Sequence, residues 1–373
     1  MEYSLVKAHI NLDAISNNIQ VLRNVMKNQT KFMAVVKADA YGHGDVRVAK
    51  KALQNGADAL GVAHFEEAVK IRQAGITAPV LIFGYIYSGQ VAFINELDLT
   101  ITIYNYDMAK ALSRAAYNLG IKINAHLKID TGMGRVGMIV NKKTICDIQK
   151  IIKMPGIKIH GIYTHLASAD HKDRTYTMLQ LNRFDSLLHD LEKENIEFKI
   201  CHAANSAGIL KYPDSHYDMV RAGISLYGLA PSNEVDISNT NLVPAMTLKS
   251  LITSTRKVPS GFKVSYGMTY ETKQETVLAS VPIGYAHGFS RLFSSNGYML
   301  VRGEKAPVAG RVCMDQTIID VGHIPDVKAE DEVVLIGRQK DKIISADELA
   351  ENINTINYEI VSSLTSRVKR IYD

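Results

Sequence analysis

Runs of apolar residues alternate with amphipathic stretches along the chain up to about residue 230. A helical pattern covers about Asp13 to Met26, and further helical stretches, such as EEAVKIRQAG and MLQLNRFDSLLHDLEKEN, separate eight apolar runs. Strands that alternate with helices indicate parallel βα units. Eight such units predict a (β/α)8 TIM-type barrel, a fold that takes about 250 residues. The runs are FMAVVKA from Phe32, ALGVAH from Ala59, PVLIFGY from Pro79, TITIYN from Thr100, IKINAHLKID from Ile121, IKIHGIYTHL from Ile157, EFKICHAANS from Glu197 and MVRAGISLYG from Met219.

A doubly wound open sheet is the main alternative fold for this pattern. That fold more often carries a GxGxxG fingerprint directly after its first strand. The first apolar run is instead followed by YGHG, residues 41–44, which does not match the fingerprint. The barrel is therefore the favoured prediction.

The pattern changes at the polar, proline-containing segment APSNEVDISNTNLVPAM, residues 230–246. Beyond it, turn residues separate runs that are typical of strands. We therefore predict two domains in a chain of the α/β class, a barrel over residues 1–239 and a C-terminal, mostly β domain over residues 240–373. The strand-like runs are MTLKSLITSTRKV, TVLASVPIGY, YMLVRG, TIIDVG and DEVVLIG.

The composition is that of a globular protein, with 46% hydrophobic and 22% charged residues. The 43 Lys and Arg residues exceed the 38 Asp and Glu residues, and the net charge of +5 fits an anionic small molecule as well as a nucleic acid. The opening residues lack the apolar core of a signal peptide. No stretch reaches the roughly 18 apolar residues of a membrane helix. Because Cys146, Cys201 and Cys313 are odd in number and form no CxxC, we expect a cytoplasmic location.

Polar residues stand at the ends of five of the predicted barrel strands. In a barrel of this kind, the carboxyl ends of the strands carry the chemistry. One polar residue at a strand end has little meaning, but five strands that contribute to one rim predict a site. The residues are Lys37 after the first run, Lys128 and then Arg135 after the fifth, His165 after the sixth, Asn205 and Ser206 after the seventh, and Arg221 and Gly223 on the eighth.

Two of these segments indicate a phosphate site. NSAG, residues 205–208, begins a helix with small residues, and a helix start offers free backbone N–H groups to an anion. RAGISLYG, residues 221–228, supplies further backbone donors. Barrels often hold phosphate in the loops after strands seven and eight. A lysine beside a phosphate site favours a Schiff-base enzyme that uses pyridoxal 5'-phosphate (PLP).

Each residue also has a simpler explanation when taken alone. A lysine at a strand end is usually a surface residue whose charged group reaches solvent. A single histidine such as His165 is more often structural than catalytic, Arg135 suits a solvated loop, and NSAG suits an ordinary helix cap. Only the joint placement of these residues favours a catalytic site.

Nine motifs resemble the PLP-dependent alanine racemase family, and they follow the family order from residue 34 to residue 361. The resemblance implies a barrel followed by a β domain, in agreement with the pattern above. It also implies a head-to-tail homodimer in which the second domain of one subunit completes the site of the other. The motifs are AVVKADAYGHG, LKIDTGMGRVG, YTHLASAD, HAANSAG, VRAGISLYG, SYGMTY, PIGYAHGF, GRVCMDQ and INYEIV.

The resemblance implies roles for individual residues. Lys37 would bond to PLP as a Schiff base, and Arg221 would face the pyridine nitrogen. Because an arginine stays protonated, that nitrogen should stay neutral. Arg135 and the backbone N–H of Met314 in the partner chain would bind the substrate carboxylate. The implied cofactor-binding residues are Lys37, Tyr41, His165, Asn205, Ser206, Arg221, Gly223, Ile224 and Tyr358.

Racemisation needs one base on each face of the substrate. The resemblance implies that Lys37 takes the proton from D-alanine and that Tyr266, from the partner chain, takes it from L-alanine. A phenol has a pKa near 10, so nearby cations must favour its ionised form. A chain from Arg221 through His165 could supply that field. Without the motif, Tyr266 would be interpreted as a turn tyrosine packed on a sheet.

Three further positions carry expectations. Lys128 lies near Arg135 and is carbamylated in part of the family, so we hypothesise a carbamate here. His287 stands where the family commonly has aspartate, which puts the hydrogen bond of that acid in doubt. Lys369 stands where proline is common, a change that concerns backbone stiffness more than chemistry.

The predicted function is therefore racemisation of alanine, with D-alanine supplied to cell-wall peptidoglycan and with no metal, nucleic acid or membrane as partner. The alternatives are a broader amino-acid or serine racemase and a PLP-binding protein without turnover. Basic amino-acid decarboxylases share the architecture, but no acidic pocket for a substrate side chain is evident. A metal-dependent barrel hydrolase would need an HxH motif on the first strand, where Lys37 stands.

Overall fold

Two compact units make up the chain in the computed structural model, which describes residues 4–373. The barrel unit comprises Ile15–Ala40 and Asp45–Val243, and the β unit comprises the described residues up to Ala14, Tyr41–Gly44 and Pro244–Asp373. The predicted boundary between residues 239 and 240 stays a prediction. Residues 1–3 of the predicted first domain lie outside the described part of the chain.

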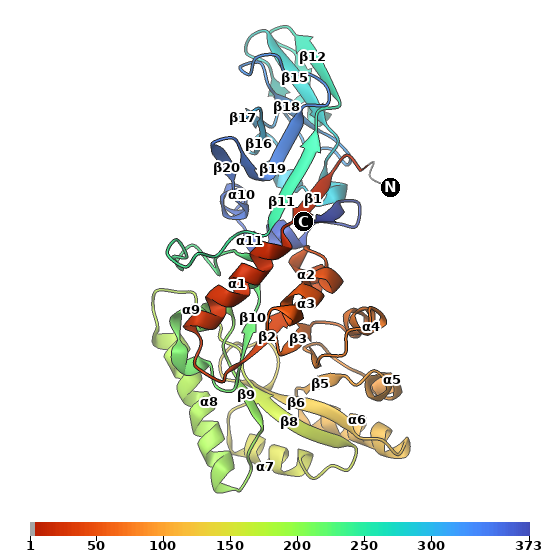
Figure 1. Ribbon diagram of the computed structural model, residues 1–373, viewed down its shortest axis with the longest axis vertical. Coiled ribbons are helices and arrows are strands. Elements are labelled where there is room, and N and C mark those ends of the chain that lie inside the picture. The colour runs from red at the N-terminus through yellow and green to blue at the C-terminus, as the bar shows by residue number, and fades with distance from the viewer. Residues whose placement is uncertain (1–3) are drawn as a thin grey trace. The chain divides into compact units, whose positions relative to one another are not determined.

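The barrel unit contains a parallel sheet with the strand order β10-β2-β3-β4-β5-β6-β8-β9 (Figure 1). Its two edge strands approach each other, since Asp218 N donates to Cys201 O and Arg221 N donates to Ala204 O, both over 3.0 Å. The predicted (β/α)8 barrel is therefore confirmed as a nearly closed sheet, and the open doubly wound sheet is excluded. The strands are β2 (Lys31–Val35), β3 (Ala59–Val62), β4 (Val80–Ile82), β5 (Thr100–Ile103), β6 (Ile123–Asp130), β8 (Ile157–Tyr163), β9 (Ile200–His202) and β10 (Met219–Ala222), with β7 (Met138–Ile139) paired to β6.

Helices connect these strands and bury one face each. In α6 the apolar residues Met108, Leu112 and Ala116 recur at a spacing of four and are buried. The Asn105 side chain caps this helix by accepting from Met108 N over 2.8 Å. Among residues 4–373, no helix combines the length and the apolar character that crossing a membrane requires. The helices are α1 (Leu12–Val25), which matches the predicted opening helix, α3 (Asp45–Gln54), α4 (Phe65–Gln73), α5 (Val91–Glu96), α6 (Tyr106–Asn118), α7 (Lys142–Ile151), α8 (Thr175–Lys193) and α9 (Ser206–Lys211).

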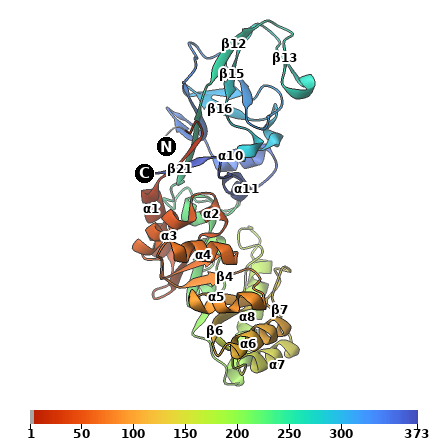
Figure 2. The same cartoon turned by 90° about the vertical axis from the view of Figure 1, so that its right-hand side faces the viewer.

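The β unit consists mostly of strands, as predicted (Figure 2), and most of their pairings are antiparallel. Its largest sheet has the order β17-β16-β19-β11-β1-β21, with β20 paired to β19, and smaller sheets join β12-β15-β18 and β13-β14. The run MTLKSLITSTRKV is not one strand, because β11 and β12 belong to different sheets. The elements are β11 (Met246–Leu251), β12 (Ser254–Val258), β13 (Lys263–Val264), β14 (Tyr270–Glu271), β15 (Thr276–Val281), β16 (Tyr298–Val301), β17 (Glu304–Pro307), β18 (Thr317–Asp320), β19 (Glu332–Gln339), β20 (Lys342–Ile344), β21 (Lys369–Tyr372), α10 (Ala346–Asn352) and α11 (Asn357–Ser362).

One strand of this sheet comes from the other end of the chain. β1 (Lys7–Ile10) pairs antiparallel with β11 and parallel with β21. The sequence pattern did not predict β1, because four residues are too few for an alternation to be distinctive. At the start of β21, Lys369 N donates to Val6 O over 3.2 Å. A proline at this position could not make that hydrogen bond.

Candidate active site

Four basic side chains gather at the carboxyl ends of strands in the barrel unit. Lys37 follows β2, Lys128 lies near the end of β6, Arg135 lies in the loop after β6, and Arg221 lies on β10. We call these four residues the cationic cluster. Burial lowers the pKa of Lys37, Lys128 and Arg221, and the charge of Arg135 lowers each of them further. The structure therefore brings these predicted site residues within electrostatic reach of one another.

Lys37 opens a left-handed turn, the segment labelled α2 (Lys37–Tyr41). The φ angles of residues 38–41 lie between 52° and 53°, a conformation that costs roughly 1–2 kcal/mol per non-glycine residue. Ala40 N donates to Val36 O over 2.9 Å inside the turn. Gly42 follows with a φ of +82°, and a Cβ atom there would lie 2.0 Å from the carbonyl oxygen of Val361. Such sustained strain is uncommon and is typical of functional sites.

A carboxylate anchors the beginning of this turn. Glu67 Oε1 accepts from Ala38 N over 2.6 Å, while its Oε2 accepts from Ala63 N over 2.7 Å and from His64 N over 3.1 Å. Glu67 therefore links the start of α4 to the residue after Lys37. Its negative charge also raises the pKa of Lys37, although burial and Arg135 outweigh this effect.

Two aspartates and a lysine hold the far side of the turn. Asp39 Oδ1 accepts from Asp45 N over 3.2 Å. Lys70 lies 2.7 Å from the Asp45 carboxylate and 3.4 Å from that of Asp39. Neither Glu67 nor Lys70 stands out in the sequence, because α4 shows only an ordinary helical pattern.

Arg221 is buried at the centre of a hydrogen-bond network. Its Nη2 donates to Thr164 O and Ala203 O, both over 2.8 Å, and to His165 Nδ1 over 3.3 Å. Its guanidinium carbon lies 5.2 Å from the centre of the Tyr163 ring, which adds a cation–π attraction. Burial lowers the pKa of Arg221 to about 10, so it stays charged at neutral pH. The contact between Arg221 and His165 brings two predicted residues together.

Two further histidines, which were not among the predicted site residues, complete this network. Arg221 Nη1 donates to His202 Nδ1 over 2.7 Å, and His202 Nε2 lies 2.9 Å from His126 Nδ1. His126 precedes Lys128 by two positions on β6, so the two side chains share one face of the strand. His202 stands within the motif HAANSAG. Strand alternation at these positions could have identified both residues.

Lys128 is only 3% exposed. Its Nζ donates to Ile129 O over 2.8 Å and to Val136 O over 3.3 Å, next to Arg135. Burial, the main cause, and the positive charge of Arg221 lower the pKa of Lys128 to about 7. The neutral amine form of Lys128 is therefore far more accessible at neutral pH than that of an exposed lysine.

Ser206 connects the ends of β9 and β10. Its Oγ accepts from Gly223 N over 3.0 Å and from Ser225 N over 3.2 Å. Asn205 caps α9, since its Oδ1 accepts from Gly208 N over 3.0 Å. The two predicted phosphate segments are therefore neighbours, and a serine hydroxyl lies between them.

The remaining predicted cofactor residues lie in the β unit. Tyr41 ends the left-handed turn and Tyr358 lies on α11. The centres of the two rings are 6.1 Å apart, so the two aromatic rings are neighbours. His165, Asn205, Ser206, Gly223 and Ile224 belong to the barrel unit.

Tyr266 and Met314 are exposed on the β unit, by 72% and 52%. Ser265 precedes Tyr266 with a φ of 63° and a ψ of −176°, a region that is almost restricted to glycine. Ser265 Oγ donates to Arg311 O over 2.7 Å and lies 3.5 Å from Cys313 Sγ. The strained turn therefore attaches Tyr266 to the loop that carries Met314.

His287 stands where the family commonly has aspartate, and the structure shows which hydrogen bond it makes there. It is buried, and its Nδ1 accepts from Gly284 N over 3.3 Å. The backbone beside it holds the Met314 loop, since Ala286 N donates to Met314 O over 3.1 Å. The imidazole therefore supplies an acceptor to this turn, as a carboxylate could.

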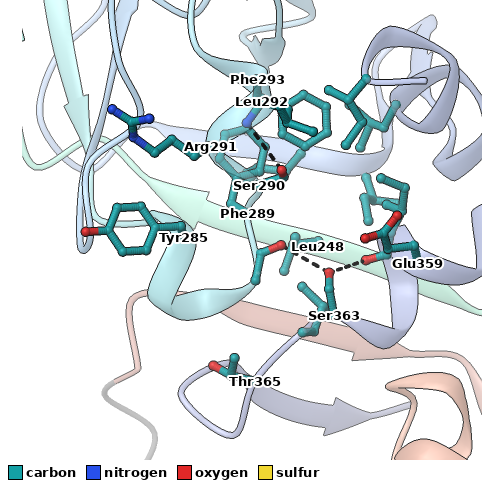
Figure 3. A pocket seen from close by; sticks show the side chains of 17 residues that line it. Leu248, Tyr285, Phe289, Ser290, Arg291, Leu292, Phe293, Glu359, Ser363 and Thr365 are labelled. Carbon is teal, nitrogen blue, oxygen red and sulfur yellow. Dashed lines mark hydrogen bonds between the residues drawn. The ribbon is translucent and has the colours of Figure 1, made fainter. Parts of the chain in front are cut away.

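A cavity of about 340 Å³ lies elsewhere in the β unit (Figure 3). Phe289 and Phe293 stack at its wall with ring centres 4.6 Å apart. Ser363 closes another side, and its Oγ lies 3.1 Å from the carbonyl oxygens of both Gly288 and Ile360, which share its single proton as acceptors. None of the predicted site residues lines this apolar cavity, so it is separate from the candidate site.

These features define a class of protein. It is the class of TIM-barrel enzymes with a partly buried lysine at a strand end and a second, mostly β unit. A family model for the N-terminal domain of alanine racemase matches residues 10–231, and one for the C-terminal domain matches residues 245–372. The chain therefore belongs to the alanine racemase family, which consists of amino-acid isomerases.

Relatives and solved structures agree with this assignment over the whole chain. The alanine racemases of Methanococcus maripaludis and Desulforamulus reducens are each 47% identical over 365 residues, 98% of this chain and 98% of the relative. The solved alanine racemase of Clostridium difficile is 38% identical, with a TM-score of 0.95 over 100% of this chain and 97% of its own. The Bacillus anthracis structure with bound L-Ala-P is 36% identical, with a TM-score of 0.94 over 100% of this chain and 96% of its own.

Proposed function

We propose that the chain binds PLP and racemises alanine with Lys37 and Tyr266 of the partner subunit as the two bases. The observation that carries this proposal is the cationic cluster around Lys37. Lysine, arginine and histidine side chains converge on one barrel rim, and burial lowers the pKa of Lys37. A lysine that loses its proton more readily is suited to covalent attachment of an aldehyde.

The residues fit an anionic cofactor. The cationic cluster holds four basic groups, and Glu67 and Asp130 are the carboxylates that act on its lysines. The phosphate and the phenolate of PLP would offset this excess of positive charge. When bound, PLP draws away the electron pair left by the departing Cα proton and so lowers the barrier to racemisation. The residues that would hold it are Lys37, Tyr41, His165, Asn205, Ser206, Arg221, Gly223, Ile224 and Tyr358.

Arg221 would donate a hydrogen bond to the pyridine nitrogen. It makes five N–H donors available and cannot accept a hydrogen bond. With its pKa at about 10, it keeps its proton at neutral pH and leaves the ring nitrogen unprotonated. Its fixed contacts to Thr164 and Ala203 keep the guanidinium from turning away.

Lys37 would remove the proton from D-alanine, and Tyr266 of the partner subunit would remove it from L-alanine. In each direction, the residue that did not take the proton would donate one to the opposite face of the substrate, which inverts the configuration at Cα. His165 accepts from Arg221 at Nδ1, so a neutral ring carries its proton at Nε2. That N–H could stabilise a tyrosine in its ionised form. Arg135 and the backbone N–H of Met314 of the partner subunit would bind the substrate carboxylate.

A head-to-tail homodimer would complete each site. Tyr266 and Met314 are exposed on the β unit, and Met268, Tyr285, Leu292 and Ile356 of the same unit are exposed as well. Exposed large apolar residues are the kind of side chain that a protein interface covers. The proposal therefore assigns the exposed face around Tyr266 to the partner subunit.

A carbamate on Lys128 is part of the proposal. Only a neutral amine attacks CO2, and a pKa of about 7 makes that form available at neutral pH. The new carboxylate would pair with the neighbouring Arg135 and orient its guanidinium. Native mass spectrometry in bicarbonate buffer should show an adduct of one CO2 per chain, and Lys128→Met should remove it. An identical mass for both proteins, corrected for the substitution, would exclude the carbamate.

The three cysteines are free thiols, which suits a cytoplasmic protein. D-alanine made there would supply cell-wall peptidoglycan. Pocket volume over the substrate methyl group decides between a strict alanine racemase and a broader racemase that accepts serine.

Exchange of the substrate Cα proton tests the proposal. The PLP-loaded protein in heavy water should exchange the Cα proton of both alanine enantiomers and bring either one to an equilibrium constant of one. Parallel assays with serine enantiomers measure specificity. Visible absorbance of bound cofactor without exchange would contradict the proposed reaction.

A further inference from the structure

The His126–His202–Arg221 chain is closed off from solvent. His126 is 5% exposed and His202 is 0% exposed. Arg221 Nη1 lies 2.7 Å from His202 Nδ1, and His202 Nε2 lies 2.9 Å from His126 Nδ1. Each link is a short hydrogen bond between two ring or guanidinium nitrogens.

The order of donors in this chain follows from Arg221 alone. A guanidinium has N–H donors and no acceptor, so His202 Nδ1 must accept. A neutral His202 ring then carries its proton at Nε2 and donates it to His126 Nδ1. His126 in turn keeps its own proton at Nε2. Burial, the main cause, lowers the pKa of His126 to about 3 and that of His202 well below its usual range, so both rings are neutral.

The fold makes a specific place for the His126 ring. The register of β6 against β8 shifts between Ala125 and His126, and Gly161 is the residue opposite His126. A Cβ atom at Gly161 would lie 2.8 Å from His126 Cε1 and 2.9 Å from its Nδ1. A bulge that redirects one side chain and a glycine that leaves it room both serve this contact.

Aromatic packing fixes the next ring in the chain. Tyr163 stacks on His202 with ring centres 4.5 Å apart and an angle of 10° between the planes. The Tyr163 hydroxyl lies 3.0 Å from Thr102 Oγ1, whose own proton goes to Ile82 O. His202 therefore has little freedom to turn, and its protonation pattern is the remaining variable.

We infer that His126 is a positioning residue, which holds His202 in the tautomer whose Nδ1 accepts from Arg221 and so aims the guanidinium. This inference rests on the proposed role of Arg221 opposite the cofactor ring. Without an acceptor at position 126, the His202 Nε2–H would be buried without a partner. The ring would then favour a proton on Nδ1, which would place two donors against each other and push the guanidinium away.

Two substitutions at one position separate this role from packing. His126→Asn keeps an oxygen near the place of Nδ1, while His126→Leu keeps volume and removes the acceptor. ¹⁵N NMR of the PLP-loaded protein reads the tautomer of His202 directly. We expect the wild type and His126→Asn to show an unprotonated Nδ1, and His126→Leu to lose that pattern.

The rate of racemisation should change together with the tautomer of His202. We expect kcat/KM for alanine to fall roughly ten- to hundredfold in His126→Leu, the loss expected for one hydrogen bond to a charged group, and to stay within about threefold of wild type in His126→Asn. The affinity for PLP should likewise fall more in His126→Leu than in His126→Asn. His160→Leu is the matched control, because His160 is partly buried on β8 and pairs with Asn124 rather than with Arg221.

Three results would overturn the inference: an unchanged His202 tautomer in His126→Leu, equal kinetic losses in His126→Asn and His126→Leu, or an equal loss in His160→Leu. The NMR measurement does not depend on turnover. A wild type that fails to exchange alanine but shows the expected tautomers would contradict the proposed function instead.

Discussion

At the scale of single residues, both proposed bases lie next to backbone in a strained conformation. Lys37 precedes four residues in the left-handed region, and Tyr266 follows Ser265, whose angles suit glycine. Strain of this kind costs about 1–3 kcal/mol per residue and persists only where neighbours enforce it. Both bases are therefore held in place by the surrounding structure rather than by local preference.

Removing each base should have a distinct effect. Lys37→Ala should abolish the visible absorbance of bound cofactor together with turnover. Tyr266→Phe should keep the absorbance and lower turnover from L-alanine by about a hundredfold or more, the usual worth of a positioned base. Steady-state rates in both directions and an absorption spectrum check this. Full activity of Tyr266→Phe would refute the assignment of two bases.

Glu67 should matter for stability through the turn that follows Lys37. Glu67→Gln keeps the shape but weakens bonds to three backbone N–H groups, so we expect a loss of about 1–3 kcal/mol and a Tm lower by roughly 2–8 °C. Glu66→Gln is the control, since Glu66 is the exposed neighbour. Calorimetry of both variants measures the difference, and equal Tm values would argue against the anchor.

Lys128 should make the free energy of unfolding rise with pH, whereas a lysine in a salt bridge makes it fall. Its pKa is about 7 in the folded chain and near 10.4 when unfolded. Between these values the unfolded state binds more protons, so the free energy of unfolding rises with pH. In CO2-free buffer, Lys128→Met should stabilise the fold by on the order of 3–5 kcal/mol below pH 7, and the gain should vanish towards pH 10.

Denaturant titrations of Lys128→Met and wild type at several pH values check that prediction. A gain that is the same at pH 6 and pH 10 would show that hydrophobic replacement, rather than deprotonation of Lys128, causes it. Bicarbonate should reduce the gain, if the carbamate forms.

At the scale of elements, the sequence predicts buried strands better than short exposed ones. The eight barrel runs are recognisable because parallel strands are apolar on both faces. β1, β17 and β20 escaped prediction because each is short and contains a charged residue, whereas the equally short β4 is wholly apolar. The rule that chemistry lies at strand ends selected Lys37, Lys128 and Arg221. Tyr266 and Met314 required the family resemblance, since an exposed loop residue has no periodicity.

The edge strand β21 begins with Lys369, at a position where the family commonly has proline, and the effect of this difference can be tested. Lys369 N donates to the carbonyl oxygen of Val6, just before β1, and Asp373 N donates to that of Ile10, at the end of β1, so the N–H groups of alternate residues face β1. Lys369→Pro loses one bond at the first residue of the strand but gains from a stiffer unfolded chain, so we expect a change within about 1 kcal/mol. Ile371→Pro, inside the strand, should cost about 3 kcal/mol. Equal losses would contradict this view of the strand start.

At the scale of the whole molecule, shared sites predict complementation between two inactive proteins. Lys37→Ala and Tyr266→Phe subunits, mixed and allowed to exchange, should form heterodimers with one intact site each. Random pairing should restore about one quarter of wild-type activity from L-alanine. If both bases came from the same chain, no mixture would exceed the activity of its components.

The position of β1 has a consequence for biosynthesis. Residues 7–10 leave the ribosome long before β11 and β21, the strands on either side of them. The barrel unit can fold once residues 15–243 have been made, apart from the short excursion at residues 41–44. The other sheet must wait until residues 369–372 have been made, and pairing over such a sequence distance is slow. Until then β1 is an unpaired strand with open edges, the state in which nascent chains aggregate. Chaperone demand during synthesis should therefore concentrate on the β unit, after the barrel is already formed.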